Sequence, residues 1–231
     1  MKKHTDMHAA QGGFTLVEIA IVLVIIGLLL GGILKGQEMI TQAKTKNVIN
    51  DFNGVAAAIY GYQDRYRALP GDDKNAFPRW AATSPGDGNG VISGVYNAAV
   101  PGTLTGLTPA VPESVFFWHH LRLSGFVSGS GADQPFNAVN GLMGVQTGDG
   151  AVTTGPVLGP NGFTGLILCS ANLPDKIAIS VDAQLDDGKG GTGAVRGQLQ
   201  TAGTPNPAIA ATAIDYTETG TAVYAACRSL L

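Results

Sequence analysis

Hydrophobic residues are concentrated near the start of the chain. Residues 14–34 form a run of 21 residues with a single charged side chain, Glu18. As an α-helix rising about 1.5 Å per residue, this run would be about 31 Å long, which matches the roughly 30 Å hydrocarbon core of a bilayer. Because only a helix satisfies its own backbone hydrogen bonds in lipid, the run predicts one transmembrane helix over residues 14–34.

The helical pattern continues after the apolar run. One stripe of apolar residues recurs at alternating intervals of four and three, which is typical of an amphipathic helix. Its members are Val48, Phe52, Val55, Ile59, Tyr62 and Tyr66. Gly54 and Gly61 weaken this stretch by about 1 kcal/mol each relative to alanine, but they do not end it. The residue before a proline is disfavoured in the α conformation, so Leu69-Pro70 ends the helix, and we expect its amphipathic half over residues 35–67.

The rest of the chain, residues 68–231, has the pattern of a small β-rich domain. All 12 prolines lie in this part, and short apolar segments alternate with glycine and proline turns. Residues 162–170, 176–185 and 221–227 predict strands, the second because its apolar residues occupy alternate positions. Residues 113–125 instead predict a short amphipathic helix that covers the sheet.

Composition and charge exclude several classes of function. The 231 residues carry a net charge of −3, with only 13% charged residues. The chain therefore lacks the excess of lysine and arginine that is typical of a nucleic-acid-binding protein. At 45% hydrophobic residues, it is too apolar for an intrinsically disordered chain. Residues 188–193 match the glycine pattern of dinucleotide-binding loops, but the sequence after them cannot form the helix that would hold the pyrophosphate. With no catalytic motif elsewhere, we expect neither an enzymatic activity nor a cofactor.

The N-terminal segment is the most specific motif in the chain. Lys2 and Lys3 precede the apolar run, but no small-x-small site follows it, which argues against a cleaved secretory signal peptide. The boundary reads Gly12-Gly13-Phe14-Thr15-Leu16-Val17-Glu18. This boundary, after a polar leader and before an uncharged run, resembles the prepilin signal of type IV pilins and of the pseudopilins of type II secretion.

The resemblance implies a processing step and an assembly residue. Residues 1–13 would be a leader, removed on the cytoplasmic side after Gly13, and Phe14 would become an N-methylated N-terminus. Glu18 would be the acid at the fifth mature position. An acid in a membrane span costs on the order of 1–3 kcal/mol unless it is paired, and the α-amino cation of Phe14 on a neighbouring subunit would supply the partner. The alternative is an acid that only reaches the lipid headgroups.

The resemblance also implies a fold, a function and partners. The fold would be α+β and type IV pilin-like, a long N-terminal helix packed on a small antiparallel sheet. The chain would wait in the inner membrane as a single-pass protein with a periplasmic C-terminal domain. It would then join an extracellular or periplasmic filament of identical or related subunits. Its partners would be a prepilin peptidase and methyltransferase, an assembly ATPase with its inner-membrane platform, and an outer-membrane secretin.

Two alternative functions remain open from the sequence. The first is a pseudopilin of a type II secretion system, which shares the N-terminal motif. The second is a singly anchored periplasmic binding domain that never polymerises, in which Glu18 would be replaceable without effect.

Cys169 and Cys227 are the only two cysteines. An even number of cysteines in an exported domain favours a disulfide, and pilins often link their C-terminal region in this way. In the chain-entropy model, closing a loop of this length contributes about 4 kcal/mol. The alternative is a pair of buried free thiols.

Acidic turns raise the question of a bound calcium ion. Asp87-Gly88-Asn89 begins like a calcium-binding loop but has no glutamate at the twelfth position, so Asp87 and Asn89 are candidate ligands without a complete motif. Other carboxylates could add oxygens, and the alternative is that all of them are solvated turns. These are Asp72, Asp73, Asp186 and Asp187.

His119 and His120 form the only adjacent histidine pair. Neighbours on a helix point about 100° apart, and no further ligand recurs at helical spacing, so a metal site is disfavoured here. We expect a surface or half-buried pair.

Overall fold

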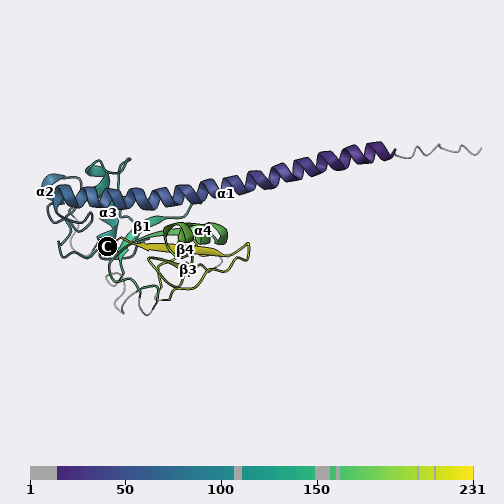
Figure 1. Cartoon of the computed structure of the whole chain (residues 1–231). Coiled ribbons are helices and arrows are strands. Elements are labelled where there is room, and N and C mark those ends of the chain that lie inside the picture. Colours follow the sequence, from purple (N-terminus) through teal and green to yellow (C-terminus); the bar gives the residue numbers. More distant parts are fainter. Residues whose placement is uncertain are drawn as a thin grey trace, which may run out of the picture. The chain divides into compact units, whose positions relative to one another are not determined.

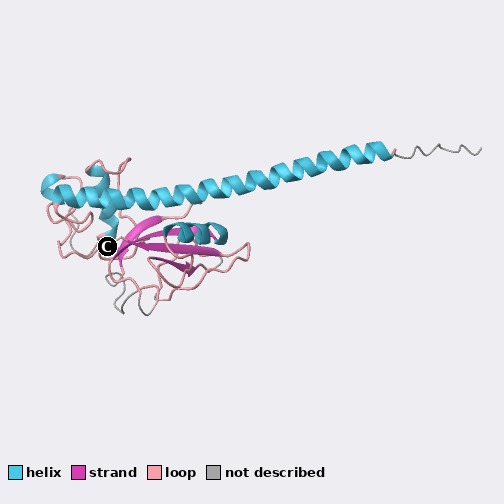
Figure 2. Ribbon diagram, in the orientation of Figure 1, coloured by secondary structure: helices cyan, strands magenta, loops and turns pink. Residues whose placement is uncertain are grey.

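The computed structural model describes residues 15–106, 111–148, 157–159, 162–201, 203–210 and 212–230 (Figure 1). The chain divides into two compact units, Met1–Ile40 and Thr41–Leu231. The first helix, α1 (Leu16–Tyr66), includes residues of both units and is drawn in cyan with the other helices in Figure 2. This helix confirms the one expected from the apolar run and the amphipathic stripe.

The N-terminal half of α1 exposes apolar side chains all around its surface. Its large apolar residues from Leu16 to Leu34 are between 46% and 91% exposed. The best 18-residue window has a mean hydropathy of 2.8, and among the described residues this is the one helix long and apolar enough to cross a bilayer. Such a surface is stable only in lipid or against other apolar surfaces.

The C-terminal half of α1 is amphipathic, as its sequence predicts. The stripe residues Val48, Phe52, Ile59 and Tyr62 are each at most 1% exposed. The helix ends at Tyr66, where Arg67 adopts a left-handed backbone conformation with a φ of 55°. The chain therefore turns just before the Leu69-Pro70 step that the sequence marks as the end of the helix.

A four-stranded antiparallel sheet forms the centre of the second unit. Its strands are β1 (Met143–Thr147), β2 (Leu166–Pro174), β3 (Val195–Leu199) and β4 (Val223–Ser229), in the spatial order β1-β2-β4-β3. The expected strands near residues 162–170 and 221–227 correspond to β2 and β4, the two central strands. The sheet confirms the predicted pilin-like α+β architecture.

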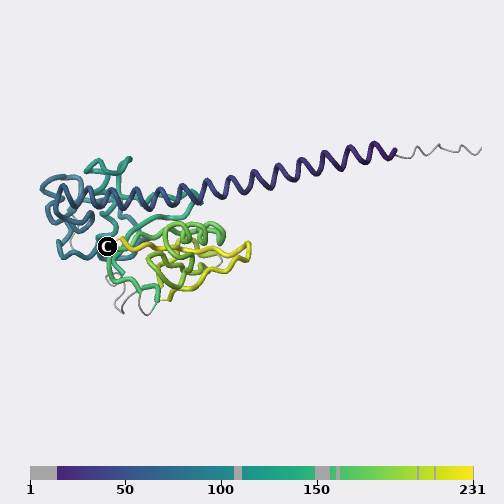
Figure 3. Tube along the Cα trace, in the orientation of Figure 1, coloured from purple at the N-terminus to yellow at the C-terminus, as the bar shows by residue number. Residues whose placement is uncertain are grey.

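Three shorter helices complete the fold. They are α2 (Ala76–Arg79), α3 (Ser114–Leu123) and α4 (Asp175–Leu185). The helix expected near residues 113–125 is α3. Figure 3 follows the chain from β2 into α4 and then on to β3, so α4 connects an inner strand to an edge strand.

The strand predicted at residues 176–185 is wrong, because this segment is helix α4. Ile177, Ala178, Val181 and Asp182 are buried, a spacing of one, three and one that fits a helical turn rather than a strand. Ile179, which the alternation placed on the same face as Ile177, is only half-buried. Pro174 and Asp175 start the helix, since proline is compatible with a helix start and an acid is favourable in the first turn.

The core lies on both faces of the sheet. On one face, the buried stripe of α1 and the apolar residues of α3 and α4 pack with Leu168 and Ala226. On the other face, Tyr96, Val157 and Leu158 pack against Cys169 and Cys227. Successive strand residues therefore point to opposite sides, and each side has an apolar cover.

Candidate functional site

Thr15 and Glu18 form a cap at the start of α1. The backbone N–H and the hydroxyl of Thr15 donate hydrogen bonds to Glu18 Oε2 at 2.8 and 2.9 Å, and the N–H of Glu18 donates to Thr15 Oγ1 at 3.2 Å. This reciprocal pattern is a capping box, which satisfies N–H groups that have no partner within the first turn. Glu18 is thus held at the end of the apolar helix by its own chain.

Glu18 is the only charged residue within the apolar surface of α1. The next charged residues along the helix, Lys35 and Glu38, pair with each other at 2.7 Å on its exposed surface. Gly13 and Phe14, the candidate processing residues, lie outside the described residues. The described part of the site is therefore a capped acid next to a long apolar surface, an arrangement suited to helix–helix packing in lipid or in a filament.

Cys169 and Cys227 form a disulfide that joins the central strands β2 and β4, so the predicted bridge is confirmed. The two residues lie directly opposite each other, with their Cα atoms 4.0 Å apart, and both are fully buried. Because 58 residues separate the two cysteines in sequence, the bond closes a long loop that contains α4 and β3.

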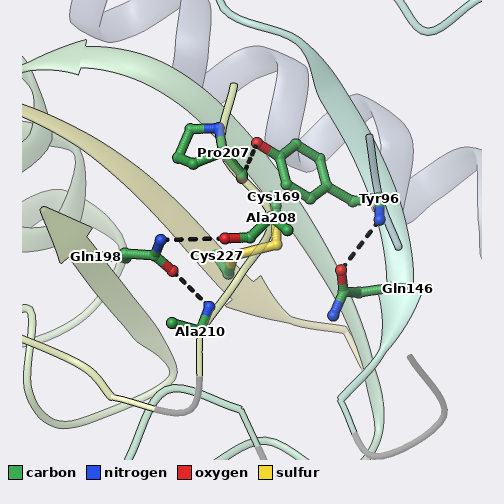
Figure 4. Close-up of a disulfide and its surroundings, with 8 residues drawn as sticks. All are labelled: Tyr96, Gln146, Cys169, Gln198, Pro207, Ala208, Ala210 and Cys227. Atoms are coloured by element: carbon green, nitrogen blue, oxygen red, sulfur yellow. Dashed lines mark hydrogen bonds between the residues drawn. A yellow bond between two sulfur atoms is a disulfide. The ribbon is translucent and has the colours of Figure 1, made fainter. Parts of the chain in front are cut away.

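Side chains on both sides of the disulfide hold the loop segment 207–210 over the bond (Figure 4). The hydroxyl of Tyr96 donates to the carbonyl of Pro207 at 2.9 Å, while its N–H donates to Gln146 Oε1 at 3.0 Å. Gln198 donates to the carbonyl of Ala208 at 3.1 Å and accepts from the N–H of Ala210 at 2.6 Å. The loop therefore shields the bond from solvent.

The calcium candidates Asp87 and Asn89 lie in a loop that is closed by hydrogen bonds to carboxylates. Asp72 accepts the N–H groups of Gly88 and Asn89 on Oδ1 and that of Gly90 on Oδ2. Asp87 accepts both the backbone and the side-chain N–H of Asn89. Burial raises the pKa of Asp72 to about 6, and the nearby Glu113 carboxylate adds to that rise.

Glu113 completes this first acidic group. Its two oxygens accept the N–H groups of Asp87 and Ser93 at 2.9 and 3.1 Å, and oxygens of Asp72, Asp87 and Glu113 lie within 4.8 Å of one another. Each of the six carboxylate oxygens in the group thus accepts a hydrogen bond. These contacts give the three carboxylates a loop-closing role without an ion, and calcium at Asp87 and Asn89 stays a prediction.

Asp73 serves a separate structural contact at the end of α1. Its Oδ2 accepts from the hydroxyl of Tyr62 at 2.8 Å and forms an ion pair with Arg79 at 2.6 Å. Burial alone would raise the pKa of Asp73, but the hydrogen bonds from Arg79 and Tyr62 outweigh it, so the pKa is lowered. Asp73 is therefore an ionised anchor between α1 and α2.

The expectation of a surface or half-buried histidine pair is wrong, because His119 is only 6% exposed and His120 is fully buried. His120 Nδ1 accepts the N–H of Gly71 at 2.9 Å, so its proton lies on Nε2, which faces Thr83 Oγ1 at 3.2 Å. Burial lowers the pKa of His120 to about 4. Neither histidine belongs to a group of possible metal ligands among the described residues.

Asp186 and Asp187, the other candidate oxygen donors, follow α4. They converge with Asp182, a buried residue within the segment for which the sequence predicts a strand. The Thr15 cap was likewise not predicted as a cap, although Thr-x-x-Glu before an apolar run is its usual signature.

Comparison with known proteins identifies the N-terminal motif. Residues 8–34 match the family described as the prokaryotic N-terminal methylation motif. No curated protein and no solved structure matches the chain. The matched segment contains the capped Glu18 and the apolar half of α1. The C-terminal half of α1 packs on an antiparallel sheet whose two central strands are joined by the disulfide. The chain therefore carries a prepilin-type N-terminal methylation motif, the motif of type IV pilins and pseudopilins.

Proposed function

We propose that this chain is a structural subunit of a type IV pilus-like filament. The observation that carries the proposal is the position of Glu18, a single acid at the capped end of a helix whose surface is otherwise apolar over residues 16–34. An isolated membrane anchor has no need of such an acid, which makes insertion into lipid less favourable. In a bundle of such helices, the acid can fix the axial position at which one helix packs against the next.

Processing would create the partner of this acid. Removal of residues 1–13 after Gly13 by a prepilin peptidase gives Phe14 a free α-amino group, which the same enzyme methylates. A methylated secondary amine stays cationic, so Phe14 of an incoming subunit can pair with Glu18 of its neighbour. Both hydrogen bonds from Thr15 end on Oε2, which leaves the lone pairs of Oε1 for this contact.

The apolar surface supplies most of the attraction between subunits. Burying apolar area contributes about 25 cal/mol per Å², and packing the N-terminal helices side by side buries their surfaces from water without any further specific contact. The ion pair then selects the axial position at which two helices meet, because a displaced pair would leave two charges without partners in an apolar bundle. Assembly would thus combine non-specific attraction with a specific register.

Location and partners follow from this assembly route. The chain would reside in the inner membrane with its β domain in the periplasm until an assembly ATPase and its membrane platform extract it. The finished filament would leave through an outer-membrane secretin. A pseudopilin would use the same steps but stay in a short periplasmic filament, whereas a non-polymerising binding domain would remain in the membrane.

The test is electron microscopy of sheared surface fibres combined with mass spectrometry of their subunits. We expect fibres built from this chain, each subunit containing 218 of the 231 residues and beginning with methylated Phe14. Cells without surface fibres but with the processed chain in periplasmic assemblies would favour the pseudopilin. An unassembled chain that still carries residues 1–13 would contradict the proposal.

A further inference from the structure

A hollow with a volume of about 400 Å³ lies at the end of the β3–β4 pair. The ladder between these strands ends at Leu199 and Tyr224, and beyond it the N–H of Gln200 donates one more hydrogen bond, to the carbonyl of Val223 at 2.8 Å. The loop that follows β3 and the segment that precedes β4 both line the hollow, together with Asn172 of β2. Three segments that are far apart in the sequence therefore build it.

Gln200 brings an unpaired hydrogen-bond donor to this hollow. The residue is only 8% exposed. Its Oε1 accepts the N–H of Asn172 at 3.2 Å, whereas its Nε2, which carries two N–H groups, has no hydrogen-bond partner. The large majority of buried side-chain polar atoms in proteins have a partner, and a buried amide without one is costly. An oxygen atom of a ligand in the hollow would supply the missing acceptor.

The lining of the hollow limits the chemistry of such a ligand. Pro205, Ala222 and Val223 supply apolar surface, and threonine side chains supply hydroxyl groups. None of the described residues that line the hollow is charged or aromatic. A charged ligand would therefore lose water without gaining a counter-charge, and a sugar would have no ring to stack on. The lining favours a neutral ligand that carries a carbonyl beside small apolar groups.

Glutamine side chains of this sheet already bind backbone groups in this way. Gln198, two residues before Gln200 and on the same side of the sheet, donates from Nε2 to the carbonyl of Ala208 at 3.1 Å. Its Oε1 accepts the N–H of Ala210 at 2.6 Å, so one side-chain amide holds a chain segment through two backbone groups (Figure 4). The Nε2 group of Gln200 offers the same donor, but no described segment accepts from it.

We propose that this hollow binds an extended, uncharged peptide segment with small apolar side chains. A backbone carbonyl of the segment accepts from Gln200 Nε2, as the carbonyl of Ala208 accepts from Gln198 Nε2, and a small side chain contacts Pro205 and Val223. Ligand pockets range from about 300 to 1,000 Å³, so a hollow near the lower limit holds only about two or three residues. This inference concerns the β domain alone and does not depend on filament assembly.

The test is two-dimensional NMR of the isotope-labelled full chain in detergent micelles, titrated with the peptide acetyl-Ala-Val-Thr-Ala-amide. We expect saturable shifts of the side-chain amide signals of Gln200, which are identified by their loss from the spectrum of Gln200→Met. The small contact area predicts a Kd of about 10⁻⁴ to 10⁻³ M. The matched peptide acetyl-Ala-Asp-Thr-Ala-amide should bind at least about tenfold more weakly, because its carboxylate meets no counter-charge in the hollow.

Variants assign the site. Thr204→Trp, at an exposed position that lines the hollow, should fill it and weaken peptide binding at least about tenfold while the chain still folds. Gln200→Met keeps the approximate shape of the side chain but removes the donor, so binding should weaken about three- to tenfold. Thr105→Trp is the matched control, because Thr105 is exposed but does not line the hollow, and it should bind the peptide as the wild type does.

Four results would each overturn the proposal. They are the absence of a shift in the Gln200 side-chain signals at about 10 mM peptide, equal binding of the two peptides, and unchanged binding by Thr204→Trp. The fourth is tighter binding of diacetylchitobiose, a neutral sugar that carries the same amide group, than of the uncharged peptide.

Discussion

Reduction of the Cys169–Cys227 disulfide should lower the stability of the β domain by a large and calculable amount. In the chain-entropy model, a crosslink between residues 58 apart removes about 14 cal/mol/K of entropy from the unfolded chain, or about 4 kcal/mol at 25 °C. The two sulfurs are buried between the central strands, so a native-state contribution from packing adds to this figure. A stability of 5–15 kcal/mol is typical of a domain, so the loss is a substantial fraction of the total.

The assay is urea unfolding of the full chain in detergent, with and without a phosphine reductant, followed by tryptophan fluorescence. Trp118 is almost fully buried and reports on the β domain. With a urea m-value of about 2 kcal/mol/M, the midpoint should fall by about 2 M when the bond is reduced. Alkylation of the unfolded, non-reduced protein should label neither cysteine. An unchanged midpoint, or full labelling of both cysteines without reductant, would refute the reasoning.

Three further predictions concern single residues. Gly54→Ala should stabilise the chain by about 0.5–1 kcal/mol because this exposed helical position has no neighbour within 4 Å. Gly61→Ala should be no more stable than the wild type in the same urea titration, because its new Cβ would lie 2.7 Å from the ring of Phe126. Burial raises the pKa of the Asp182 carboxyl from 3.8 to about 6, so the folded chain keeps this group protonated at higher pH than the unfolded chain does. The contribution of Asp182 to the free energy of unfolding should therefore fall as pH rises from about 4 to 6, and Asp182→Asn should flatten that fall in urea titrations at several pH values.

The sequence predicts the long helix well because two independent signals agree there. An uncharged run of bilayer length and a stripe at helical spacing both require a helix, and Leu69-Pro70 marks its end within a few residues. The central strands and the disulfide follow from apolar segments between turns and from the parity of two cysteines. These features depend on local pattern and need no knowledge of distant contacts.

The wrong predictions concern segments whose structure depends on tertiary contacts. Ile177, Ile179 and Val181 satisfy a period of two, but the same ten residues also fit a helix, and packing of α4 on the sheet selects the helix. Burial of His120 depends on the backbone N–H of Gly71, which is 49 residues away. The convergence of Asp182 with the acids of the following loop becomes visible only once residues 176–185 are helical.

We propose that Glu18 directs filament assembly by pairing with the N-terminus of a neighbouring subunit. Replacing Glu18 with valine removes an acid from an apolar span, so membrane insertion should be unchanged or slightly improved. The incoming α-amino cation would then have no partner in an apolar bundle, which costs on the order of several kcal/mol at each addition. Glu38→Val is the matched control, since it removes the same side chain from the same helix beyond the apolar run.

The decisive measurement is the yield of sheared filament relative to total cellular subunit for the wild type, Glu18→Val and Glu38→Val. We predict that Glu18→Val accumulates in the membrane as processed subunit but forms almost no filament, whereas Glu38→Val assembles like the wild type. Equal filament yield from Glu18→Val and wild type at equal expression would contradict the claim and leave this chain as an anchor whose acid has no part in assembly.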